Sequence, residues 1–248
     1  ADISQFALIA APHSHAAAAE AVRLARNGKV EALMKGSLHT DELMHEVMLS
    51  ENGLRTERRV SHVYIFDVPS YPRPLLVTDA AINIAPTLSE KCDICQNAID
   101  LAHILGIPMP KVAILSAVET VNERLPSTID AAALCKMADR GQILGGILDG
   151  PLAFDNAVSM EAARAKHIVS PVAGQADILL VPNIEAGNIL AKQLTFFDHA
   201  DAAAIVLGAR LPIILTSRAD SVQTRIASCA VAALVADTRR HSVLVSAD

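Results

Sequence analysis

Apolar residues recur along this chain in two alternating patterns. Short aliphatic runs bounded by turn residues are typical of buried strands, and apolar residues spaced three and four positions apart predict helices. We expect strands at 6–10, 30–34, 60–68, 75–79, 112–115, 146–149, 178–181, 203–206 and 213–216. We expect helices at 14–26, 40–49, 88–105, 127–138, 156–165, 185–197 and 221–235, with Thr40 as the N-cap of the second.

The regular alternation of strands and helices predicts an α/β fold. Such an order argues for mostly parallel sheets with flanking helices on both faces. The Pro-rich turn at 69–74, which lies between two strands, predicts a hairpin-like element within that order. Ligands of α/β sheets bind beyond the carboxyl ends of the strands, so the segments that follow strands are the first candidates for a site.

Composition narrows the classes of protein that fit. The chain has 248 residues, enough for one large or two modest domains, and its hydrophobic fraction of 52% is mostly aliphatic because aromatic residues make up only 3%. No stretch reaches the roughly 20 apolar residues of a membrane-spanning helix, and no targeting segment is present at the start, which predicts a cytoplasmic protein that binds no membrane. The net charge of −6 and the absence of a basic run argue against nucleic-acid binding.

The four cysteines predict neither a disulfide framework nor a metal site. Cys92, Cys95, Cys135 and Cys229 are too few and too scattered for a disulfide scaffold. The first two form a C-x-x-C pair on one face of a predicted helix, but no second Cys or His pair completes a tetrahedral zinc site. We therefore expect these thiols to be reduced and to serve packing.

Residues 212–221 are the strongest candidate site, because an apolar strand ends there in polar groups at a predicted helix start. Helix N-terminal amides attract anions, Arg218 can bind a phosphate through two parallel hydrogen bonds, and Ser217 can donate to a developing oxyanion. The alternative is a capped helix, with Asp220 or Ser221 as the N-cap and Arg218 on the surface.

The segment 34–40 has a similar order, since it follows a strand and offers the ammonium of Lys35, the flexible Gly36, and then His39 and Thr40 at a helix start. Its glycine spacing matches neither the dinucleotide-binding motif nor the P-loop. A solvated loop is the alternative.

Two further segments could face the same crevice. Asp79 ends a strand and is followed by Asn83, and residues 170–174 form a turn that offers the Ser170 hydroxyl and backbone donors up to Gly174. Asp79 could equally satisfy a local turn, and Asn83 a backbone amide.

Taken together, five segments resemble the phosphate acetyl/butyryltransferase family in content and order. They are residues 34–40, 78–83, 170–174, 181–188 and 215–221. The resemblance of each segment is weak by itself, but five such segments in the same order are specific to the family. Residues 149–156 look most like the phosphate acyltransferase part of bifunctional enoyl-CoA hydratase/phosphate acetyltransferase proteins, and no hydratase domain is seen in this chain.

The resemblance implies a two-domain α/β fold similar to that of isocitrate and isopropylmalate dehydrogenases, with the active site in a cleft between the domains and usually a homodimer. Residues 58–204 would form the inserted domain, and residues 1–57 with 205–248 the other one. Family members usually carry further strand and helix units ahead of the first strand expected here, so this chain looks short at its start.

The resemblance also implies the reaction: acetyl-CoA or butyryl-CoA plus inorganic phosphate gives acyl phosphate plus CoA, reversibly, by direct attack in a ternary complex that needs no metal or cofactor. Arg218 matches the arginine that binds phosphate and the oxyanion, and Ser217 the adjacent hydroxyl donor. Nine further positions are expected to bind substrate: Lys35, Gly36, His39, Thr40, Asp79, Asn83, Ser170, Gly174 and Ser221.

Two positions depart from the acetyltransferase pattern. Thr224 stands where some acetyltransferases have an acidic residue, so we expect Asp220, the nearest carboxylate, to act as the base that takes the thiol proton. Met44, next to His45, stands where acetyltransferases have an arginine, which bears on phosphate affinity and acyl preference.

Two other classes stay open at the level of sequence. A metal-dependent dehydrogenase of the same fold would need clustered aspartates and a nucleotide site. A noncatalytic protein that binds CoA or acyl phosphate would keep the binding segments without turnover, and the departure at Thr224 fits this class. The choice between acetyl and butyryl groups is likewise open.

Overall fold

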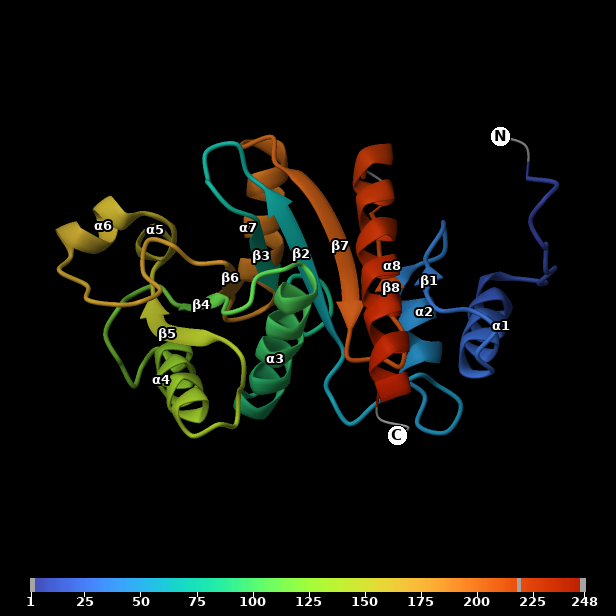
Figure 1. The fold of residues 1–248 in the computed structure, drawn as a ribbon, viewed down its shortest axis with the longest axis horizontal. Helices are drawn as coiled ribbons and strands as arrows, with labels where there is room; N and C mark the ends of the chain where they lie inside the picture. The colour runs from blue at the N-terminus through green and yellow to red at the C-terminus, as the bar shows by residue number, and fades with distance from the viewer. Residues whose placement is uncertain (1–2, 218–219, 246–248) are drawn as a thin grey trace.

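A single mixed sheet forms the centre of the molecule. The computed structural model describes residues 3–217 and 220–245, and within them eight strands pair in the order β1-β8-β7-β2-β3-β6-β4-β5 (Figure 1). The strands are β1 (Leu33–Met34), β2 (Ser61–Asp67), β3 (Leu75–Thr78), β4 (Lys111–Leu115), β5 (Ile147–Leu152), β6 (Ile178–Leu180), β7 (Asp201–Leu207) and β8 (Ile213–Ile214). The helices are α1 (Ser14–Arg26), α2 (Thr40–Val47), α3 (Leu88–Ile104), α4 (Pro126–Asp139), α5 (Phe154–Val158), α6 (Met160–Ala165), α7 (Ile184–Phe196) and α8 (Val222–Val245).

The direction of the strands changes across the sheet. The hairpin β2–β3 is antiparallel, as the Pro-rich turn predicts, and β2–β7 and β7–β8 are antiparallel as well. The remaining pairs, β1–β8, β3–β6, β6–β4 and β4–β5, are parallel. The α/β class is therefore confirmed, with parallel pairs at both ends of the sheet and the antiparallel strands at its centre.

Helices cover both faces of the sheet because successive residues of each strand point to opposite sides. On β3, Leu76 packs into the cluster formed with α3, α4 and α8, whereas Leu75 and Val77 pack into the cluster formed with α5, α6 and α7. A third cluster joins α1 and α2 to β1 and β8. In Figure 1, α3 and α8 lie on the near face of the sheet and α7 lies behind it.

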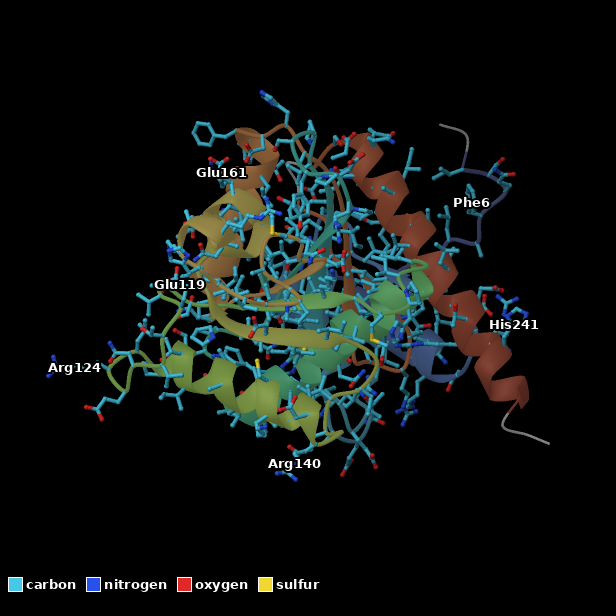
Figure 2. The ribbon with its side chains drawn as sticks, turned by 60° about the vertical axis from the view of Figure 1, so that its left-hand side comes forward. Phe6, Glu119, Arg124, Arg140, Glu161 and His241 are labelled. Atoms are coloured by element: carbon cyan, nitrogen blue, oxygen red, sulfur yellow. The ribbon has the colours of Figure 1, made fainter. Side chains whose placement is uncertain are left out.

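The strand expected at residues 6–10 is absent, which corrects that prediction. Phe6, Leu8 and Ile9 are exposed, and the segment leaves the body of the molecule beside α1 (Figure 1; Phe6 is labelled in Figure 2). An aliphatic run has strand propensity, but it forms a strand only where a neighbouring strand pairs with its backbone groups.

Three helix boundaries also differ from expectation. The helix expected at 156–165 is split into α5 and α6 at Ser159, whose extended backbone breaks the first helix and whose hydroxyl accepts from Ala162 N at the start of the second. His39, not Thr40, is the N-cap of α2. The last helix extends to Val245, beyond the expected end at residue 235.

The cysteines are free thiols, as expected. Burial raises the pKa of Cys95 above its ordinary range and that of Cys135 to about 12, so neither forms a thiolate readily. Among the described residues, no group of three or more His, Cys, Asp or Glu side chains could hold a metal ion. In the same part of the chain, no helix combines the length and the apolar character needed to cross a bilayer.

Candidate active site

Three adjoining cavities in the described part of the chain have Ser217 in their lining. The basic cavity, of about 440 Å³, is lined by Met34, Lys35, Gly36, Ser37, Thr216, Ser217 and Arg225. The histidine cavity, of about 510 Å³, is lined by Lys35, Leu38, His39, Thr40, His62, Tyr64, Ala81, Leu215, Thr216 and Ser217. The helix cavity, of about 620 Å³, runs along α7 and the start of α8 and is lined by Tyr64, Asn188, Ala191, Lys192, Thr195, Phe196, His199, Ala200, Asp201, Ala202, Ser217, Asp220, Ser221 and Thr224. We call the three together the Ser217 crevice.

The chain reaches Ser217 directly from the sheet. Strand β8 ends at Ile214, and the next two residues are still buried before Ser217 emerges. The Ser217 amide donates to Asp220 Oδ2 at 2.5 Å, and the Asp220 amide donates to Ser217 O at 3.2 Å. Arg218 lies outside the described residues.

The start of α8 is capped locally. Ser221 Oγ accepts from Thr224 N at 3.0 Å, the bond that an N-cap residue makes. Ser221 and Asp220 thus each accept a local backbone hydrogen bond, as expected if this segment only caps a helix. Both residues also line the helix cavity. Their roles in substrate binding and proton transfer stay predictions.

The loop after β1 meets the Ser217 loop because β1 and β8 are parallel neighbours. Lys35 is buried, its amide donates to Ile214 O at 3.0 Å, and its Nζ donates to Gly36 O and Leu38 O at 3.2 Å each. An ammonium has three donors, so one of them is left for a ligand. Lys35, His39 and Thr40 line the histidine cavity, and Gly36 lines the basic cavity, so the structure brings the whole predicted segment to the crevice.

Asp79 and Asn83 form a buried turn in the wall of the crevice. Asp79 Oδ1 accepts from the amides of Ala81 (2.9 Å) and Ile82 (3.0 Å), and Oδ2 accepts from Asn83 N (3.3 Å) and Asn83 Nδ2 (2.6 Å). Asn83 Nδ2 also donates to Val60 O. Both side chains therefore satisfy local bonds, and Ala81 is the residue of this turn that lines the histidine cavity. A direct contact of Asp79 or Asn83 with substrate stays a prediction.

Gly187 allows α7 to approach this turn closely. A Cβ atom at Gly187 would lie 2.8 Å from Asp79 O and 3.0 Å from Ala80 Cα, closer than side chains tolerate. Asn188 Nδ2 donates to Ala80 O at 3.3 Å beside it. The segments 78–83 and 181–188, far apart in the sequence, thus build one wall.

Ser170 and Gly174 lie elsewhere. Ser170 Oγ accepts from the amides of Val172 and Ala173, and the Gly174 amide donates to Asn156 O at 2.7 Å. Gly174 has a φ of 77° and a Cβ there would lie 2.5 Å from the backbone of Met160, so only glycine fits. Neither residue lines the Ser217 crevice, and substrate binding by this turn stays a prediction.

The search at strand ends missed two residues within β2. His62 and Tyr64 alternate along the strand, point to the same side, and meet edge to face with ring centroids 4.6 Å apart. Burial lowers the pKa of His62 to about 4, against the opposing charge of Asp79, and burial with the charge of Asp220 raises the pKa of Tyr64 to about 12. A histidine and a tyrosine at alternate positions among the apolar residues of a strand are the signal that could have identified them.

A third residue that sequence reasoning missed is Arg225 on α8, which adds a guanidinium to the basic cavity. It lies one helical turn after Ser221, in the first turn of α8. The basic cavity therefore gathers a lysine, an arginine and three hydroxyl groups in one place.

Comparison of the sequence with known protein families identifies the family of this chain. Residues 9–233 match the family model described as "Phosphate acetyl/butaryl transferase". The chain belongs to the phosphate acetyl/butyryltransferase family. A phosphate acetyltransferase of Rhizobium meliloti is 67% identical over 239 residues, 96% of this chain and 76% of the relative. A phosphate butyryltransferase of Clostridium acetobutylicum is 46% identical over 238 residues, 96% of this chain and 79% of the relative.

Solved structures agree on the fold. A branched-chain phosphotransacylase from Enterococcus faecalis V583 superposes with a TM-score of 0.82 at 38% identity, covering 90% of this chain and 79% of that one. A 4-hydroxythreonine-4-phosphate dehydrogenase from Klebsiella pneumoniae shares the fold alone, with a TM-score of 0.52 at 14% identity over 90% of this chain and 70% of that one. The predicted dehydrogenase-like fold of this transferase family is confirmed, while the finer likeness to bifunctional hydratase proteins stays a prediction.

Proposed function

We propose that this protein is a phosphate acyltransferase that converts acetyl-CoA or butyryl-CoA and inorganic phosphate to acyl phosphate and CoA, reversibly, in a ternary complex. The observation that carries the proposal is the meeting of three cavities of different character at one hydroxyl, Ser217. A reaction between two bound substrates needs two binding sites that converge on one reacting centre.

Inorganic phosphate fits the basic cavity. Lys35 and Arg225 supply positive charge, and Ser37, Thr216 and Ser217 supply hydroxyl donors around about 440 Å³. Charge-assisted hydrogen bonds from such groups are the strongest that proteins offer to a phosphate. The chain carries a net charge of −6, so this local concentration of basic groups is what overcomes the overall repulsion of an anion.

The CoA arm fits the helix cavity. Its lining includes Ser217, Asn188 and Lys192 of α7, and Thr224 of α8. Bound there, the arm would place its thioester at Ser217, where phosphate arrives from the basic cavity.

The chemical step then follows from these positions. A phosphate oxygen bonds to the thioester carbonyl carbon, the carbonyl oxygen becomes an oxyanion, and the carbon–sulfur bond breaks to release CoA. Ser217 Oγ and the guanidinium of Arg218 donate to the oxyanion. In the reverse direction Asp220, whose carboxylate lies 2.5 Å from the Ser217 amide, takes the proton of the CoA thiol.

The test is the release of CoA thiol from acetyl-CoA and butyryl-CoA when phosphate is added. We expect phosphate-dependent release that falls at least about 100-fold in Arg218→Ala. Arg140→Ala is the matched control, because Arg140 is an exposed arginine at the end of α4 (Figure 2) and lines none of the three cavities.

Folded protein that binds CoA tightly but turns over in neither direction would contradict the proposal and favour a noncatalytic binding protein. Metal-dependent reduction of NAD would instead favour a dehydrogenase.

Further properties belong to the same proposal and are supported by the family alone: a cytoplasmic homodimer that needs no metal or organic cofactor, with residues 58–204 as the inserted domain and residues 1–57 and 205–248 as the other. Light scattering tests the dimer, and activity after dialysis against a chelator tests the metal. Residues of both predicted domains line the histidine cavity, which supports an active site between them.

A further inference from the structure

His62 is a buried side chain with an unmet hydrogen-bonding atom at the edge of a cavity. It is 1% exposed in the middle of the sheet, lines the histidine cavity, and its Nδ1 atom makes no hydrogen bond with the described residues. A buried polar atom without a partner costs about 1–3 kcal/mol. A partner supplied by a ligand in the cavity would remove this cost when the ligand binds.

Among the described residues, no polar neighbour of His62 bonds to its Nδ1 atom. Asp79, whose charge acts on the imidazole, accepts four hydrogen bonds within its own turn. The Nζ atom of Lys35, which lines the same cavity, donates to two carbonyl groups of its loop, and its third donor makes no hydrogen bond to Nδ1. Tyr64 meets the imidazole through its ring. The free Nδ1 atom is thus not the other half of an internal pair.

The chemistry of His62 favours hydrogen bonding over proton transfer. Burial lowers its pKa to about 4, so the ring is neutral at neutral pH. Such a weak base cannot take a proton from a thiol with a pKa near 8.5. A neutral imidazole can still donate one N–H, and neutral histidines polarise substrate carbonyl groups in this way.

The surroundings of His62 suit an acyl group better than a phosphate. Leu38, Ala81 and Leu215 add apolar surface to the histidine cavity, whereas the basic cavity next to it holds the second cation, Arg225. The carbonyl oxygen of an acyl group is an acceptor only, and a neutral donor in partly apolar surroundings complements it.

We propose that His62 is a further catalytic residue, which donates its Nδ1–H to the carbonyl oxygen of the acyl group as that group passes between CoA and phosphate. The inference rests on the acyl transfer proposed above. No proton moves from His62: its hydrogen bond strengthens while the oxygen carries negative charge and weakens when the carbon–sulfur bond breaks and the carbonyl re-forms.

Three substitutions of His62 distinguish the contribution of its Nδ1 atom from that of its Nε2 atom. The amide nitrogen of asparagine can occupy the place of Nδ1, that of glutamine lies near the place of Nε2, and phenylalanine has neither. We expect His62→Phe and His62→Gln to lower kcat for phosphate-dependent thiol release about 100-fold with KM for phosphate within about threefold, and His62→Asn to retain kcat within about tenfold. His241→Phe is the control, because His241 is exposed near the far end of α8 (Figure 2).

Wild-type kcat in His62→Phe, or an equal loss in all three variants, would overturn the inference, the second because it indicates a structural role. An inactive wild-type protein in the same assay would instead contradict the acyl transfer itself.

If the variants do not fold, a measurement on the wild-type protein tests the same hydrogen bond. In protein with ¹⁵N-labelled histidine, acetyl phosphate should shift the Nδ1 resonance of His62, and phosphate alone should leave it in place. No shift with acetyl phosphate, or the same shift with phosphate alone, would overturn the inference.

Discussion

Asp79 and His62 are both buried polar side chains, His62 in β2 and Asp79 directly after the neighbouring strand β3, yet the hydrogen bonding around them is opposite. Thr78, the residue before Asp79, donates its hydroxyl to His62 O at 2.9 Å, so the two sites are joined. Asp79 has four donors around its carboxylate, and His62 has none at Nδ1 among the described residues. The fully bonded group holds the wall of the crevice in shape, and the residue with the unbonded atom lines the histidine cavity.

The largest expected effect on stability is that of Asp79→Ala. Removing the carboxylate leaves three backbone amides and the Asn83 amide without their acceptor in a buried turn, so we expect a loss of roughly 4 kcal/mol or more in the free energy of unfolding. Urea unfolding measures it. Asp139→Ala, which removes an exposed carboxylate paired with Lys136, should change stability by less than about 0.5 kcal/mol. Wild-type stability in Asp79→Ala would contradict a structural role for this turn.

Gly187→Ala should destabilise the protein by about 2 kcal/mol. The added methyl group meets Asp79 O and the Ala80 backbone, and these atoms can move only if the turn and α7 separate. The same unfolding experiment measures the loss. A variant as stable as the wild type would show that α7 and the turn are not tightly packed.

Acid should weaken the protein through His62 by a similar amount. The pKa of His62 is about 4 in the folded protein and near 6.5 when unfolded, so the unfolded chain binds more protons between these values and stability falls as pH falls through that window. Between pH 7 and pH 4.5 the wild type should lose about 2 kcal/mol more than His62→Asn. Parallel pH curves for the two proteins would contradict a buried neutral imidazole.

Gly36→Ala should have the smallest effect on stability, within about 0.5 kcal/mol. A Cβ atom at Gly36 meets nothing within 4 Å, which makes the variant a matched partner for Gly187→Ala. Because Gly36 lines the basic cavity, a rise in KM for phosphate without a loss of stability would support its predicted contact with substrate. A large loss of stability would show that Gly36 serves the fold instead.

Much of the fold could be predicted from the sequence because most elements follow local rules. Helix α1 has the predicted bounds, and the Pro-rich turn between β2 and β3 forms the predicted hairpin. The prediction of a strand at residues 6–10 was wrong because an aliphatic pattern is a local feature, whereas a strand needs a pairing strand elsewhere in the chain. The break at Ser159 was missed because the apolar period continues across it.

The candidate site was predictable only where polar residues follow strands. The Lys35 and Ser217 segments, both chosen by that rule, line the same cavities because β1 and β8 are parallel neighbours. The Ser170 turn, which was a weaker candidate for the same crevice, lies apart, and the sequence does not show which segments are adjacent in the fold. The rule missed His62 because it considers only residues that follow strands, and His62 lies within β2.

The most direct test of the central claim, that acyl transfer occurs at Ser217, compares kcat in Ser217→Ala and Thr238→Ala. Thr238 is an exposed hydroxyl on α8 whose Oγ1 bonds to Leu234 O, outside the crevice. We predict a loss of about 100-fold or more in phosphate-dependent thiol release for Ser217→Ala, with unchanged stability, and wild-type kcat for Thr238→Ala. Equal, wild-type rates in both folded variants would contradict the placement of the reaction at Ser217.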